Sequence, residues 1–121
     1  MTDFLTEKII GAGIEVHRNL GPGLLESIYE EALCYEFELR GIRFRRQVDV
    51  EVIYKGKVIK GQRIDVLVEG EVIVEIKSLS KLPDVATAQL LSYLKATGLK
   101  RGLLINFGAK MLRDGIKRIS L

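Results

Sequence analysis

The spacing of apolar residues changes at Phe44, and this change sets the order of secondary structure along the chain. Between residues 4 and 40, apolar side chains recur every three or four positions, which is the period of an amphipathic helix. The turn at Gly21-Pro22-Gly23 divides this region into one helix before it and a second over residues 24–40. The second helix is expected to bury a stripe of Leu25, Ile28, Ala32, Tyr35 and Leu39, with Tyr29, Leu33 and Phe37 beside it.

After Phe44 the apolar residues alternate, which is the pattern of a strand. Three consecutive strands are predicted, over residues 44–54, 58–68 and 72–78. The turns at Lys55-Gly56 and Glu69-Gly70 join them as an antiparallel meander, and the third strand is apolar enough to be central.

The last third of the chain returns to a helix and then to strands. Pro83 opens a helix that Gly98 closes, and residues 103–107 form a buried strand. A turn of helix at 110–113 and a short edge strand at 116–119 are expected to follow. The order is α-α-β-β-β-α-β with a possible final strand, which makes residues 1–121 a single α+β domain.

The scarcity of histidine and cysteine limits the chemistry available to this domain. His17 and Cys34 are the single residues of their kinds, which excludes a Cys/His zinc cluster and an internal disulfide. Any metal must therefore be held by oxygen. The sequence has no run of about 18 apolar residues and no basic leader at its start, so a cytoplasmic protein without a membrane span is expected.

Basic residues are concentrated in two places, although the net charge is only +3. Residues 95–121 hold 7 basic and 1 acidic side chains, and a second cluster of basic side chains lies within residues 40–46. Clustered cations attract phosphates and release counterions, so the sequence permits a nucleic-acid partner. An alternative is that the arginines protect strand edges. The candidate nucleic-acid contacts are Arg43, Arg45, Arg46, Lys110 and Arg113.

Three charged residues interrupt otherwise apolar strands, where an ionised group is costly unless it is paired or bound to a metal. Glu75 and Lys77 point the same way, roughly 6 to 7 Å apart, and Asp65 on the preceding strand can lie beside them. Two converging carboxylates suit Mg²⁺, and a neighbouring lysine can orient a water or stabilise charge on a phosphate. The alternative is that Asp65 pairs with Lys77 or Arg63 while Glu75 faces solvent.

This ordered set of residues resembles the PD-(D/E)XK nuclease superfamily, with an acid at Asp65, the triplet Glu75-Ile76-Lys77, and a helix bearing Gln89 and Tyr93. Gly23-Leu24-Leu25-Glu26-Ser27-Ile28-Tyr29 resembles more closely the signature of the GxxExxY family within that superfamily. Further segments similar to that family are Leu20-Gly21-Pro22-Gly23, Arg46-Gln47, Tyr54-Lys55-Gly56 and Leu104-Ile105-Asn106-Phe107-Gly108.

The resemblance implies a restriction-endonuclease-like fold, an α-β-β-β-α-β core with an extra N-terminal helix and a mixed central sheet flanked by helices. It also implies roles for individual residues. Asp65 and Glu75 would bind Mg²⁺ or Mn²⁺, with Glu26 completing the metal site, and Lys77 would be the catalytic lysine. Ile64, in place of a proline, precedes the acid, a departure that the superfamily tolerates widely.

The resemblance places the remaining candidates around these four. Gln89 is grouped with the catalytic residues and shares a helix face with Tyr93, while Tyr29 and His17 are supporting residues. The implied activity is metal-dependent hydrolysis of phosphodiester bonds in DNA or RNA. The alternatives are a catalytically inactive nucleic-acid-binding module and a protein-interaction module, with a homodimer or a protein partner possible in each case.

Overall fold

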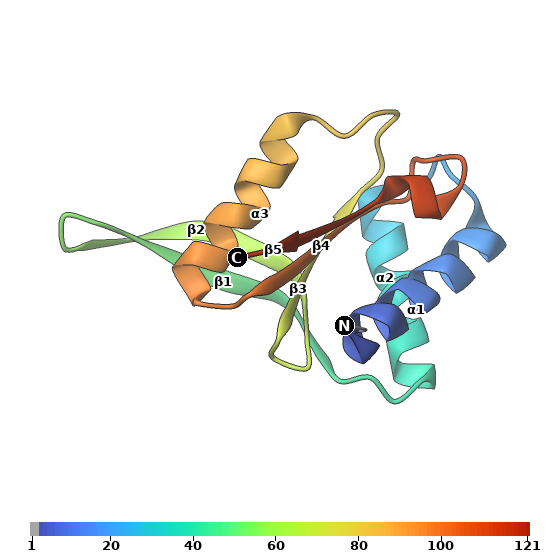
Figure 1. The fold of residues 1–121 in the computed structure, drawn as a ribbon, viewed down its shortest axis with the longest axis horizontal. Helices are drawn as coiled ribbons and strands as arrows, with labels where there is room; N and C mark the ends of the chain where they lie inside the picture. The colour runs from blue at the N-terminus through green and yellow to red at the C-terminus, as the bar shows by residue number, and fades with distance from the viewer. Residues whose placement is uncertain (1–2) are drawn as a thin grey trace.

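A mixed five-stranded sheet lies at the centre of the structure, a computed structural model that describes residues 3–121 (Figure 1). Its strands lie in the order β1-β2-β3-β4-β5, so β3 is central as predicted. All neighbouring strands are antiparallel except β3 and β4, which are parallel. The elements are α1 (Phe4–Leu20), α2 (Glu26–Leu39), β1 (Phe44–Tyr54), β2 (Lys57–Val68), β3 (Val72–Lys77), α3 (Asp84–Thr97), β4 (Arg101–Asn106), a 3₁₀ turn (Leu112–Gly115) and β5 (Ile116–Ser120).

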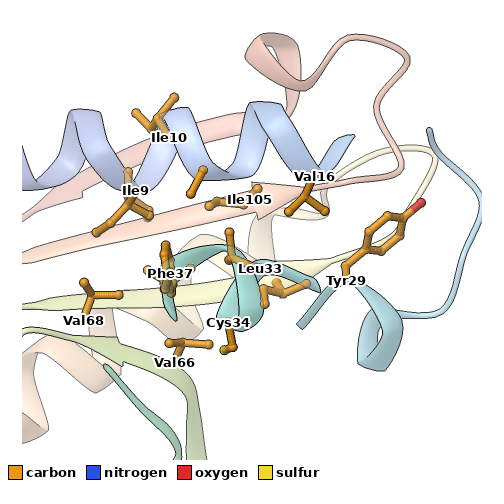
Figure 2. Close-up of a cluster of buried hydrophobic side chains, with 14 of the residues drawn as sticks. Ile9, Ile10, Val16, Tyr29, Leu33, Cys34, Phe37, Val66, Val68 and Ile105 are labelled. Atoms are coloured by element: carbon orange, nitrogen blue, oxygen red, sulfur yellow. The ribbon is translucent and has the colours of Figure 1, made fainter. Parts of the chain in front are cut away.

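Helices cover both faces of the sheet and divide the core in two. Figure 2 shows the first part, where α1 and α2 pack against one face through residues such as Ile9, Leu33, Phe37 and Val66. On the other face, α3 packs through Leu90 and its neighbours against β2, β3 and β4. The predicted α+β fold with a restriction-endonuclease-like core is therefore confirmed. The final strand is also present, preceded by the 3₁₀ turn at 112–115 rather than at 110–113.

The face of α2 that packs on the sheet differs from the predicted one. Tyr29, Leu33 and Phe37 are fully buried, whereas the expected stripe is turned away from the core, with Ala32 at its half-buried edge. The prediction that this stripe is buried is wrong. Both stripes are apolar and both have helical spacing, so the period alone could not decide which one faces the sheet. The exposed members are Leu25, Ile28, Tyr35 and Leu39.

Asp3 fixes the start of α1 and connects it to β4. Its Oδ1 accepts a hydrogen bond from the Thr6 backbone N–H at 3.1 Å, and its Oδ2 accepts bonds from the Thr6 hydroxyl and the Arg101 guanidinium. The hydrogen bond from Arg101, followed by the one from the Thr6 hydroxyl, lowers the pKa of Asp3 to about 2. The carboxylate therefore satisfies an N-terminal N–H of the helix that would otherwise lack a partner.

Replacing Asp3 by alanine is expected to lower the free energy of unfolding at neutral pH by about 1 kcal/mol, the usual value of a helix N-cap. Because the pKa of Asp3 is depressed on folding, this contribution is complete above its ordinary value of 3.8 and disappears as the pH falls through about 2. Urea denaturation at several pH values measures it. Asp114→Ala, which changes an exposed carboxylate that forms no ion pair within residues 3–121, is the control and should leave stability unchanged. An Asp3 effect that persists at the lowest pH would contradict the assignment.

Within residues 3–121, none of the helices is both long and apolar enough to cross a membrane.

Candidate active site

The candidate site lies where β2 and β3 stop pairing as a regular ladder. Regular pairing reaches Val66 and Val74, so the next residues in register are Asp65 on β2 and Glu75 on β3. Here side chains replace backbone partners. The Asp65 N–H donates to Glu75 Oε2 at 2.8 Å, and the Ile76 N–H donates to Asp65 Oδ2 at 2.8 Å. Each carboxylate is thus fixed by the backbone of the opposite strand, and the two acids lie next to each other.

Both carboxylates are sheltered from water. Glu75 is 3% exposed and Asp65 is half-buried. Burial, together with the charge of Asp65, raises the pKa of Glu75 to about 8. Burial also raises the pKa of Asp65, although the hydrogen bond from Ile76 opposes this shift. Two adjacent acids with raised pKa values mark a place where an added positive charge is stabilising.

The charge of Lys77 reaches both acids, because it lowers the pKa of Asp65 and of Glu75. Lys77 is the last residue of β3 and is half-buried. The alternative in which Glu75 faces solvent is wrong, because its side chain is almost fully buried. Arg63, the other partner considered for Asp65, lies 3.3 Å from Asp49 instead.

Glu26 lies close to these residues but is not part of the carboxylate pair. It is exposed in the first turn of α2, and its Oε2 accepts a hydrogen bond from the Ser78 N–H at 3.2 Å. Ser78 directly follows Lys77, and the charge of Glu26 contributes to the raised pKa of Asp65. Across the described residues, no three acidic, histidine or cysteine side chains are grouped so that they could hold a metal ion. The structure thus brings together Asp65 and Glu75, with Glu26 at their edge.

Glu30 is a further acidic residue near the site, and the sequence analysis did not identify it. It lies one helical turn after Glu26 and is 8% exposed. Its carboxylate accepts hydrogen bonds from Arg46 Nε and Gln47 Nε2, both at 2.9 Å. Gln47 is placed between two residues of β1 that pair with the neighbours of Asp65, and it has a left-handed backbone with φ of 52°. The Arg46-Gln47 segment was noted in the sequence, but its partner on α2 is too distant along the chain for a local pattern to show.

Helix α3 carries a buried tyrosine near the two acids. Tyr93 is 3% exposed. Its pKa is raised by burial and then by the charges of Glu75 and Asp65, which places its hydroxyl within the field of both carboxylates. Gln89 lies one turn earlier on the same helix face and is half-buried. Tyr93 therefore lies near the carboxylate pair, whereas the position of the Gln89 side chain relative to that pair stays a prediction.

Comparison with known proteins identifies the family. The family model of the PD-(D/E)XK nuclease superfamily matches residues 3–119. The chain belongs to the PD-(D/E)XK nuclease superfamily. Nucleases of this superfamily generally use divalent metals and act on nucleic acids. No match was found among the curated proteins or among the solved structures compared with the chain.

Tyr29 and His17, the two predicted supporting residues, hold the loops around the site. The Tyr29 ring stacks on Phe107 with centroids 4.5 Å apart, and its hydroxyl donates to the Gly21 carbonyl and accepts from the Leu24 N–H. His17 Nε2 lies 2.8 Å from the carbonyl oxygen of Ala109. Tyr29 thus holds the turn that leads into Glu26, and His17 holds the loop that follows β4.

Asn106, at the end of β4, fixes the segment that follows Lys77. Its side-chain Oδ1 accepts from the Leu79 N–H at 2.9 Å, and its Nδ2 donates to the Leu79 carbonyl at 2.9 Å. Gly108 lies so close to this segment that a Cβ there would come within 2.2 Å of the Leu79 oxygen. These contacts hold the ends of the two parallel strands in a fixed relation beside the carboxylate pair.

The basic candidates are distributed between the two ends of the sheet. Arg43 pairs with Glu69 in the β2–β3 turn at 3.0 Å, at the end of β3 opposite to Lys77, and Arg45 lies exposed two residues further on. Arg46 is bound to Glu30 and Glu31. Lys110 and Arg113 are exposed and follow β4, whose end pairs with Lys77. Of the five candidates, Lys110 and Arg113 lie at the end of the sheet that carries the carboxylate pair, and Arg46 is bound near the pair through Glu30.

Proposed function

We propose that this chain is a metal-dependent nuclease that hydrolyses phosphodiester bonds in DNA or RNA. The observation that carries the proposal is the pair of buried Glu75 and half-buried Asp65 beside Lys77, at a point where two strands exchange backbone for side-chain hydrogen bonds. Membership of the nuclease superfamily supports it. Two adjacent acids that are sheltered from water destabilise the folded chain. Their arrangement is therefore better explained by function than by stability.

The donor atoms of the pair fit a hard divalent cation. One oxygen of each carboxylate accepts a backbone N–H, whereas Asp65 Oδ1 and Glu75 Oε1 accept no hydrogen bond from residues 3–121. Carboxylate oxygen is the preferred ligand of Mg²⁺ and is also suitable for Mn²⁺. We propose Asp65 and Glu75 as the ligands, with Glu26 as a third at the edge of the site. The ion would lower the pKa of a water and neutralise charge on the phosphate.

The chain's own residues would position the reactants. Lys77 is proposed to orient the attacking water and to balance negative charge on the phosphate, because its charge already acts on both acids. Gln89, half-buried on the face of α3 that carries Tyr93, is proposed to hold the water or the scissile phosphate. Lys110 and Arg113, at the same sheet edge, would bind flanking phosphates.

Within the superfamily, we propose that the chain is a GxxExxY protein. The three signature residues have separate tasks in the structure. Gly23 has φ of 104°, which favours glycine, and Tyr29 holds the turn through its hydroxyl. Glu26 faces the segment beside Lys77. A motif whose members each meet a distinct structural need is more informative than its spacing alone.

The proposal is tested by incubating the purified protein with supercoiled DNA and with labelled RNA, in the presence of Mg²⁺, Mn²⁺ or EDTA. Cleavage of at least one substrate is expected with either metal and none with EDTA. The exposed carboxylate of Asp49 offers a matched control, and Asp49→Asn should cleave like the wild type. Binding of nucleic acid without cleavage in any metal would instead favour an inactive binding module.

A further inference from the structure

Helix α2 carries an apolar face that the fold leaves uncovered. We call it the α2 stripe, and it consists of Leu25, Ile28, Ala32, Tyr35 and Leu39. Its four large members are 74%, 46%, 61% and 63% exposed in chain order. Together with Ala32 they recur at alternating steps of three and four residues, so the five side chains form one continuous line along the helix. An exposed apolar line of this kind marks a protein-binding surface rather than a solvated face.

The border of the α2 stripe is acidic. Glu31 and Glu38 lie three residues after Ile28 and Tyr35, so they border the stripe on one side. Glu31 is 70% exposed and is bound to Arg46, whereas Glu38 forms no ion pair with residues 3–121. An apolar line with an acidic border repels nucleic acid. It fits a protein surface that is both apolar and basic.

The same chain carries such a surface on the β1–β2 hairpin. We call residues 51–60 the arm, and every one of them is exposed. The apolar side chains of the arm include Ile53, which is 69% exposed, and Tyr54, which is 60% exposed. The basic side chains of the arm are Lys55, Lys57 and Lys60. The base of the arm borders α3, because Glu51, Val52 and Ile53 line a hollow with residues of that helix. The outer part of the arm extends beyond α3 (Figure 1). A two-stranded hairpin is only marginally stable on its own in water, so a cover for this part would stabilise it.

We propose that two copies of this chain form a dimer in which the arm of each lies on the α2 stripe of the other. Figure 1 shows the arm projecting from one end of the long axis, with α1 and α2 at the other end, so an arm cannot reach its own α2. Two copies side by side in opposite directions place each arm at the partner's helix. Their contacts are equivalent by a two-fold axis, which is the commonest symmetry of oligomers.

Charge and area both favour this occupant. Lys55 and Lys57 would face the border formed by Glu31 and Glu38, while the branched side chains of the arm cover the stripe. The stripe runs for about 21 Å along a helix roughly 10 Å wide, so its face offers roughly 200 Å². Each copy contributes one stripe and one arm, so the exchanged arrangement buries twice the area of a single contact and comes closer to the roughly 800 Å² per partner of a stable interface. A single contact would fall short of that value.

The test is a charge exchange between two variants, followed by sedimentation or light scattering over a range of concentrations. The arm variant is Lys55→Glu/Lys57→Glu and the helix variant is Glu31→Lys/Glu38→Lys. The wild type is expected to be a dimer, and each variant alone should dimerise at least about tenfold more weakly. An equal mixture should regain the wild-type affinity as a heterodimer, because both of its contacts then join opposite charges. Lys8→Glu/Lys117→Glu, which changes exposed lysines elsewhere, should remain dimeric.

Several results would overturn the proposal. A wild type that stays monomeric at all concentrations shows that the arm and the stripe do not bind each other. If the arm variant dimerises like the wild type while the helix variant is monomeric, the contact is between two α2 helices and does not involve the arm. A mixture that stays monomeric excludes the exchanged arrangement. The measurement needs no substrate and no metal, so it is independent of whether the chain is a nuclease.

Discussion

The Glu75→Gln variant is expected to lose nucleic-acid cleavage by about 10³-fold or more. Glutamine keeps an oxygen that can accept the Asp65 N–H, so the local hydrogen bonding is retained while the charge is removed. Asp65→Asn and Lys77→Met are expected to have similar effects. Initial cleavage rates of each purified variant, measured with Mg²⁺ and with Mn²⁺, test the prediction.

The double variant Glu75→Gln/Lys77→Met distinguishes a joint role from two separate ones. If the two residues act on the same step, the double variant should be no slower than the worse single variant. Lys81→Met is the matched control, because Lys81 is an exposed lysine in the loop that follows Lys77. A Glu75→Gln enzyme that cleaves at the wild-type rate would remove the carboxylate pair from the proposed mechanism.

The sequence was sufficient for the fold because the hydrophobic period changes only where the structure changes. The helices, the strands and the central position of β3 follow from that period and from the glycine and proline turns. The orientation of α2 does not follow. One of the two apolar stripes of α2 packs on the sheet and the other does not. Which one packs depends on residues such as Val66 and Ile105, which are far away in sequence.

The core of the candidate site could be predicted because its residues violate a local rule. Asp65 and Glu75 are acids in apolar strands, and such a conflict between position and chemistry indicates function. Glu30 violates no local rule, since an acid on a helix is ordinary. It is buried beside β1, where Arg46 and Gln47 donate hydrogen bonds to its carboxylate. The site residues that were missed are therefore those whose partners are set by tertiary structure.

The Glu75→Gln variant is also expected to be more stable than the wild type at alkaline pH in the presence of EDTA, by up to about 5 kcal/mol. Folding raises the pKa of Glu75 from 4.5 to about 8, because the charged form is buried beside Asp65. Below its ordinary pKa of 4.5, Glu75 is protonated in both the folded and the unfolded chain, so it does not lower the free energy of unfolding. The free energy of unfolding then falls as the pH rises from 4.5 through about 8. Above that pH it stays at the lower value, because Glu75 is then ionised in the folded chain as well.

Urea denaturation across this pH range measures the effect. The difference between the variant and the wild type should be close to zero below about pH 4.5, grow through neutrality and level off above about pH 8. Glu71→Gln, which changes an exposed acid just before β3, provides a control that should show no such trend. A variant that is less stable than the wild type at every pH would show that the Glu75 charge is not the source of strain.

Divalent metal provides the link between this stability effect and the proposed function. If the strain of the carboxylate pair exists to hold a cation, Mg²⁺ or Mn²⁺ should raise the thermal stability of the wild type but not that of Glu75→Gln. The gain should increase with pH, because a cation binds the ionised carboxylates and the raised pKa values keep them protonated at lower pH. Metal would then relieve in the wild type the same repulsion that the substitution removes. The inactive Glu75→Gln variant would thus resemble the metal-bound wild type in stability. This result is expected of a pair of acids that binds a cation, and not of a pair that only destabilises the fold.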